Sequence, residues 1–166
     1  DECAASNKDV AVIQRILAVH RTVPAVHLHC AMHSFRNGTD LWFKHLGLKS
    51  TSHGPQVPIA VSFVDNEHPI TKGMSDWTTP QGELYFIKTA YSTMTPLAES
   101  LSKKTKTMHT NIWVNAYGPN ETRVFGTSIG HHNETMLDPN YMEMITRGLL
   151  WAAGKPVLEN INSNNL

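Results

Sequence analysis

The chain has 166 residues, of which 17% are charged, with equal numbers of acidic and basic side chains and a formal net charge of zero. A balanced charge provides no broad basic surface for nucleic acid or an anionic membrane, so we expect neither as a partner. No apolar run approaches the roughly 20 residues that span a bilayer, and the length suits one domain. Histidine, in contrast, occurs ten times, and imidazole is a common acid, base and metal ligand near neutral pH.

Two cysteines, Cys3 and Cys30, are too few for a disulfide framework or a four-cysteine zinc site. They form either one bridge in an oxidising compartment or two free thiols, and we favour the free thiols.

The first third of the chain predicts two helices and a strand. Residues 10–17 place apolar side chains at helical spacing, and residues 25–28 form a short strand. This is half of a βαβ unit whose first strand precedes residue 1, so we expect the carboxyl-terminal part of a larger domain, with Asp1 inside the fold. Residues 41–46 follow as a second helix, which Gly47 ends.

The rest of the chain predicts a turn-rich connection at residues 49–58 and a short helix or turn at 95–102. The expected strands are 59–64, 81–87, 111–117 and 123–129, of which the last two form a β-hairpin around Gly118-Pro119-Asn120. The last helix covers residues 139–153, with Asp138 as its cap and Pro139 in its first position.

Polar side chains follow two of the expected strands at the point where each strand ends. His29, Cys30 and His33 follow residues 25–28, and His131, His132 and Asn133 follow the strand that Gly130 ends. Ligands of open α/β sheets bind outside the carboxyl ends of the strands. If these two strands are parallel neighbours, their polar ends meet.

Five short motifs occur in one order along residues 24–155, namely HCAMHS (29–34), HPITKG (68–73), GELY (82–85), RVFGTSIGHHNET (123–135) and RGLLWAAGK (147–155). In this order the chain resembles the trehalose-utilisation, or ThuA-like, family. The resemblance implies a class I glutamine-amidotransferase-like (flavodoxin-like) α/β fold. We therefore expect a three-layer α/β/α sandwich with a mostly parallel sheet in one domain, residues 1–158, followed by a flexible tail, residues 159–166.

The resemblance also implies a site without a cysteine nucleophile. In glutamine amidotransferases a cysteine occupies the turn between a strand and a helix, whereas the ThuA-like pattern at this turn corresponds to His27-Leu28-His29. His29 thus takes the position of the nucleophile, and Cys30 turns away from the site. Carried over by motif, the site comprises His29, Glu83 of GELY and His131, and glutamine hydrolysis is not expected.

These residues leave several roles open. His29, Glu83 and His131 are the candidate catalytic residues, as acid, base or ligand groups; alternatively, Arg36 or Arg147 holds the Glu83 carboxylate. A divalent metal on His29, His33 and His131 is another alternative, because His29 and His33 share one face of an α-helix. Side chains that could bind a polyhydroxylated ligand are His33, Arg36, His132 and Asn133.

Two classes of function remain. The first is an enzyme, a hydrolase or isomerase, that acts on a trehalose-type disaccharide or ketosugar in the cytoplasm or periplasm of a bacterium. The second is a noncatalytic ligand-binding or interaction module, or a histidine-rich metal-binding protein. A sugar is the expected partner, and a homo-oligomer or another chain could complete the sheet. The substrate, the metal and the oligomeric state are not named by the sequence.

Overall fold

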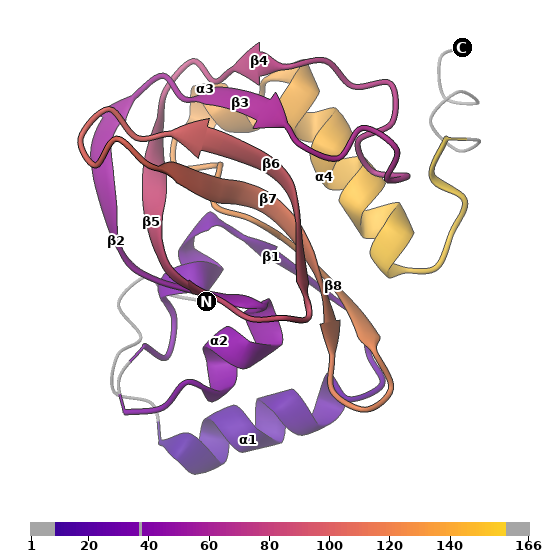
Figure 1. Cartoon of the computed structure of the whole chain (residues 1–166). Helices are drawn as coiled ribbons and strands as arrows, with labels where there is room; N and C mark the ends of the chain where they lie inside the picture. The colour runs from indigo at the N-terminus through magenta and orange to yellow at the C-terminus, as the bar shows by residue number, and fades with distance from the viewer. Residues whose placement is uncertain (1–8, 37, 159–166) are drawn as a thin grey trace.

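The computed structural model describes residues 9–36 and 38–158 as an α/β fold with two sheets (Figure 1). No helix in these residues is long and apolar enough to cross a bilayer. The helices are α1 (Val10–Val19), the 3-10 helix η1 (His29–His33), α2 (Leu41–Leu46), α3 (Asn133–Met136) and α4 (Pro139–Ala152). The strands are β1 (Ala25–Leu28), β2 (Leu48–Val57), β3 (Ala60–Phe63), β4 (Trp77–Thr78), β5 (Gly82–Ala90), β6 (Met94–Leu101), β7 (Met108–Tyr117) and β8 (Thr122–Thr127).

The larger sheet is mixed, with the strand order β1-β8-β7-β6-β3-β4. Among the described strands, β1 and β8 form the one parallel pair, and all other neighbours are antiparallel. The expected mostly parallel sheet is therefore wrong, and the three-layer sandwich around such a sheet is not confirmed. Strands β6, β7 and β8 follow one another through short turns, which reverse the chain, whereas parallel pairing needs a crossover of a dozen or more residues.

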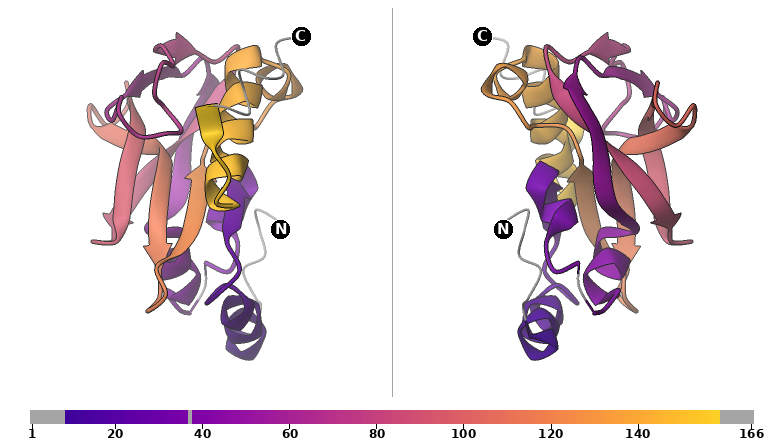
Figure 2. Two further views of the ribbon diagram at one scale, coloured as in Figure 1. Left: turned by 90° about the vertical axis from the view of Figure 1, so that its right-hand side faces the viewer. Right: turned by 90° about the vertical axis from the view of Figure 1, so that its left-hand side faces the viewer.

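Helix α4 lies along one side of the larger sheet, and α1 lies below α4 in both views (Figure 2). The core around α4 includes Leu84 of β5, whereas Tyr85 of β5 packs in a second core with α1 and α2. Successive side chains of a strand point to opposite faces, so Val114 packs in the core with α4 while Trp113 packs with α2. The Trp113 Nε1 donates to the Leu46 carbonyl at 2.7 Å. Its indole covers Gly126 of β8, where a Cβ atom would lie 2.3 Å from the ring, so only glycine fits there.

Several expected elements are confirmed. Strand 25–28 and helix 41–46 have the expected bounds, the last helix begins at Pro139, and β7 and β8 form the expected antiparallel hairpin. The expected location of Asp1 and the expected flexible tail fall on residues outside the described ranges.

Two segments that we expected to lack strands are strands. Of residues 49–58, all but the last belong to β2, which pairs with β5 through an irregular register with several shifts. Residues 95–102 belong largely to β6, whose register against β7 shifts beside Pro96. Proline donates no backbone hydrogen bond and is accepted in strands at such irregularities. Tertiary pairing has overridden the local turn signals in both segments.

Two histidines are buried together between β1 and α2. The Nε2 atoms of His27 and His45 lie 2.9 Å apart, and the His20 ring stacks on His45 with centroids 4.8 Å apart. Burial lowers the pKa of His27 to about 3 and the pKa of His45 to about 2, and neighbouring imidazoles contribute less to both shifts. Both rings are therefore neutral at neutral pH.

We expect this pair to make the fold sensitive to acid. Each folded-state pKa lies below the unfolded value of 6.5, so the unfolded chain binds more protons, and stability is lost as the pH falls below 6.5. The loss is up to about 1.4 kcal/mol per pH unit for each histidine. Urea unfolding between about pH 7 and about pH 5 measures this slope, and His45→Gln should reduce it by about one proton. An unchanged slope in this variant would contradict the assignment.

Candidate active site

The site begins at the carboxyl end of β1, where His29 starts η1. Its φ angle of 39° lies in the left-handed region, which residues with side chains rarely adopt and which recurs at functional sites. His29 Nδ1 donates to the Ser128 carbonyl at 2.7 Å. Ser128 directly follows β8, the parallel neighbour of β1. Because a carbonyl only accepts, Nδ1 carries the proton, and the lone pair of Nε2 faces the site.

The β2-β5 ribbon supplies the opposite wall. Glu83 and Tyr85 are two residues apart on β5 and therefore share a face. On β2, Gln56 is the register partner of Glu83, and His53 is the register partner of Tyr85. The pairing thus brings two further polar side chains beside the GELY motif.

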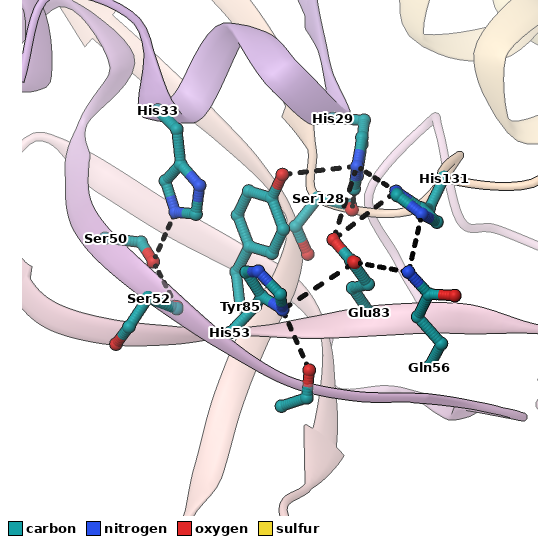
Figure 3. A network of polar contacts seen from close by, with 11 residues as sticks. His29, His33, Ser50, Ser52, His53, Gln56, Glu83, Tyr85, Ser128 and His131 are labelled. Atoms are coloured by element: carbon teal, nitrogen blue, oxygen red, sulfur yellow. Dashed lines mark hydrogen bonds and ion pairs between the residues drawn. The ribbon is translucent and has the colours of Figure 1, made fainter. Parts of the chain in front are cut away.

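Three side chains converge between these walls (Figure 3). His29 Nε2 lies 3.1 Å from His131 Nδ1 and 3.8 Å from Glu83 Oε2, and His131 Nδ1 lies 3.4 Å from the same carboxylate oxygen. The three side chains that we expected to share one cleft thus lie within contact of one another. Glu83 and His131 line a pocket of about 510 Å³ together with His33, Arg36, Thr51, Ser52, His53 and Tyr85, whereas His29 is not among the lining residues.

Gln56 connects two members of this group. Its Nε2 donates to Glu83 Oε1 at 3.1 Å and lies 3.0 Å from His131 Nε2. An amide nitrogen only donates, so in this arrangement His131 Nε2 accepts, and His131 carries its proton on Nδ1. That proton points toward His29 and Glu83.

Burial keeps several of these groups neutral. It lowers the pKa of His29, and the nearby His131 lowers it further, while the bond to Ser128 and the charge of Glu83 act against the shift. Burial, followed by the charge of Arg36, lowers the pKa of His33 to about 4. Burial, followed by the charge of Glu83, raises the pKa of the Tyr85 hydroxyl. At neutral pH the pocket therefore offers neutral imidazole and phenol groups beside a carboxylate.

The expected binding residues divide into two pairs. His33 and Arg36 line the pocket, where His33 stacks on Tyr85 with centroids 4.0 Å apart and its Nε2 lies 3.1 Å from Ser50 Oγ. His132 directly precedes α3 without a capping bond from its side chain, and Asn133 is exposed in the first turn of this helix. Neither of these two residues lines the pocket.

The group of possible metal ligands in the structure differs from the expected group by one residue. Within the described ranges, the single group of side chains able to hold an ion is His29, Glu83 and His131, and His33 is not part of it. The pairing of His29 with His33 assumed an α-helix, but η1 is a 3-10 helix. With three residues per turn, positions i and i+4 no longer share a face.

Two further expectations fail. Arg147 does not hold Glu83, because its guanidinium is bonded to Glu143 and to the carbonyls of Ile70 and Lys72. Cys30 is in a disulfide, so the expected free thiol is wrong at this position, and Cys3 lies outside the described residues. Cys30 is not among the residues that line the pocket.

Sequence reasoning missed four residues that line the pocket, Thr51, Ser52, His53 and Tyr85, and it also missed Gln56, which bonds to Glu83. Tyr85 had a usable signal, since it lies two positions from Glu83 in the same strand. His53 and Gln56 had none, because their segment was expected to be a turn-rich connection.

The fold and the pocket together define an α/β protein with a mixed sheet and a histidine–glutamate site at the ends of its parallel strands. The chain matches the model of the ThuA family, described as trehalose utilisation, over residues 9–152. The chain therefore belongs to the ThuA family.

Solved structures show the same fold. A ThuA-like protein from Parabacteroides merdae matches with a TM-score of 0.74 and 20% identity, over 90% of this chain and 68% of that one. A ThuA-like protein from Bacteroides uniformis matches with a TM-score of 0.74 and 19% identity, over 93% and 70% of the two chains. A search of curated proteins finds no match.

The electrostatics of the pocket predict how His29 titrates. Because burial lowers its pKa, the ring should be neutral at neutral pH and gain a proton only below pH 6.5, the ordinary value. Imidazole NMR signals followed during an acid titration measure this, with His29→Gln used to assign the resonance. A midpoint at or above the ordinary value would contradict the environment described here.

Proposed function

We propose that the protein is an enzyme of carbohydrate utilisation that moves protons on a ketosugar, or on a trehalose-type disaccharide in its keto form. Family membership supports the carbohydrate role. The observation that carries the catalytic part is the convergence of His29, Glu83 and His131, with nitrogen and oxygen atoms 3.1 to 3.8 Å apart, beside a pocket that Glu83 and His131 line. Its volume of about 510 Å³ falls within the range of small-molecule sites.

The composition of the pocket argues against simple glycoside hydrolysis. Most glycosidases need two carboxyl groups on either side of the bond that breaks, and Glu83 is the one carboxylate among the described lining residues. A single carboxylate surrounded by imidazoles suits proton abstraction beside a carbonyl group, followed by return of the proton elsewhere. An isomerase or a related acid–base enzyme therefore fits better than a hydrolase.

Each side chain then has a role in this proposal. Glu83 accepts a proton, because its Oε2 faces the cluster and its Oε1 is held by Gln56. His131, with its proton on Nδ1, donates, and neutral His29 passes protons between Tyr85 and His131, both of which lie within 3.2 Å of its Nε2. His33 and Arg36 bind sugar hydroxyls from the pocket wall.

The proposal uses no thiol nucleophile, in keeping with the disulfide at Cys30. A disulfide also favours an oxidising compartment such as a periplasm over the cytoplasm.

The test is turnover against a panel of disaccharides and ketosugars. We expect Glu83→Gln and His131→Gln to lower kcat by roughly 10²–10⁴-fold, the usual contribution of general acid–base groups, while ligand binding is retained. His68→Asn is the matched control, because His68 lies in a loop away from the pocket, where its Nδ1 accepts from the Ile70 amide.

A noncatalytic binding module gives a different result. It would bind a sugar without any turnover by the unmodified protein, and the same variants would change affinity alone. That outcome would overturn the enzyme proposal.

A further inference from the structure

We propose that His29, Glu83 and His131 bind a zinc ion, with the open side of the ion facing the pocket. For its catalytic use this inference rests on the proposed function, but the binding itself does not depend on it. The set differs from the one suggested by the sequence, since the Glu83 carboxylate takes the place of His33.

The separations of the three ligand atoms fit tetrahedral zinc. Bonds of about 2.0–2.1 Å place neighbouring ligands of a tetrahedral ion about 3.3–3.4 Å apart. The three separations in the structure are 3.1, 3.4 and 3.8 Å, close to that value. Two imidazoles and one carboxylate are also a zinc donor set, whereas magnesium and calcium prefer oxygen ligands.

The charge of Glu83 also favours a bound cation. Its side chain is 7% exposed, and its ion-pair partners are imidazoles alone, from His29, His53 and His131. No lysine or arginine of residues 9–36 and 38–158 forms an ion pair with it. Buried charges are usually paired or coordinate a metal, and a divalent cation between Glu83 and the two imidazoles would supply the missing positive charge.

The surrounding groups already orient two of the ligands. His29 is fixed by the bond from its Nδ1 to the Ser128 carbonyl, which leaves Nε2 free to coordinate. Glu83 Oε1 accepts from Gln56, which leaves Oε2 directed at the cluster. Histidine ligands of metals almost always donate their other nitrogen in this way.

Binding requires one rearrangement. His131 would coordinate through Nδ1, so its proton must move to Nε2, which now faces the Gln56 nitrogen. Rotation of the Gln56 amide by half a turn presents its oxygen to that proton instead, and the bond from the Gln56 nitrogen to Glu83 Oε1 is then given up. Gln56 therefore responds to the ion, and its loss should weaken binding without abolishing it.

The ion would leave a position open, because three protein ligands plus water is the arrangement of catalytic zinc. The pocket wall with Tyr85 and His53 borders that position. There the ion would polarise the carbonyl of a ketosugar. Glu83 would then be a ligand, and proton acceptance would pass to a hydroxide that a five-coordinate ion holds beside the carbonyl.

The experiment is a Zn²⁺ titration of the full chain after dialysis against a chelator, followed by calorimetry, with the visible spectrum of the Co²⁺ form as a second readout. We expect one tight site per chain and a spectrum typical of four-coordinate Co²⁺. His131→Gln and Glu83→Gln should raise the dissociation constant by more than the roughly 10–100-fold that loss of a supporting group costs, and Gln56→Ala should fall within that range.

Two matched histidine variants serve as controls. His33→Gln removes the ligand that the sequence suggested, and His68→Asn removes an imidazole outside the pocket. Both should leave the affinity unchanged. Circular dichroism of each variant verifies folding, and His131→Gln is the safest ligand variant because His131 is the most exposed of the three.

The outcomes separate this inference from the proposed function. Zinc affinity that survives both His131→Gln and Glu83→Gln, or that falls equally in His33→Gln, overturns the site. Full ketosugar turnover by protein that binds no Zn²⁺ overturns the zinc centre and leaves the enzyme proposal intact. Tight binding at these ligands without turnover of any sugar supports the zinc centre and counts against the enzyme.

Discussion

The whole site depends on the parallel pairing of β1 with β8. This pairing places the carboxyl ends of two strands, separated by about a hundred residues of sequence, side by side. His29 then leaves β1 in a left-handed conformation, and its bond to the Ser128 carbonyl ties the two strand ends together. Three residues beyond Ser128, His131 meets the same imidazole. Without this register, the two histidine clusters of the sequence would not form one site.

The β2-β5 ribbon adds what the parallel strands lack, namely a carboxylate. Alternation along β5 directs Glu83 and Tyr85 to the site, while Leu84 between them belongs to the hydrophobic core that includes α4. The irregular register of β2 brings His53 and Gln56 opposite these two residues. A regular strand would alternate strictly, so the shifts allow residues three positions apart, His53 and Gln56, to reach one site.

The sequence was informative where local signals agree with tertiary structure. The strand at residues 25–28, the helix at 41–46 and the hairpin at 111–129 have clear periodicity or turn signals, and family motifs pointed to the three converging side chains. It failed where tertiary pairing decides the outcome. Gly54 and Pro55 are turn signals within strand β2, and Pro96 is one within β6, so neither strand was expected. The mainly antiparallel pairing of the strands was also missed. Short turns join β6, β7 and β8, whereas the expectation of parallel strands came from the family resemblance and from the helix–strand alternation in the first third of the chain.

The two buried histidine groups show why composition alone does not locate a site. His27 and His45 are neutral, bonded to each other and surrounded by Trp42, Tyr117 and the ring of His20. No carboxylate of the described residues pairs with them, so these two imidazoles have no partner for proton transfer to a ligand. Their main effect is on stability in acid. His29 is also buried, but it faces Glu83 and Tyr85, which line a pocket. The nearby carboxylate and the access to solvent make the second group, and not the first, the candidate for ligand binding and proton transfer.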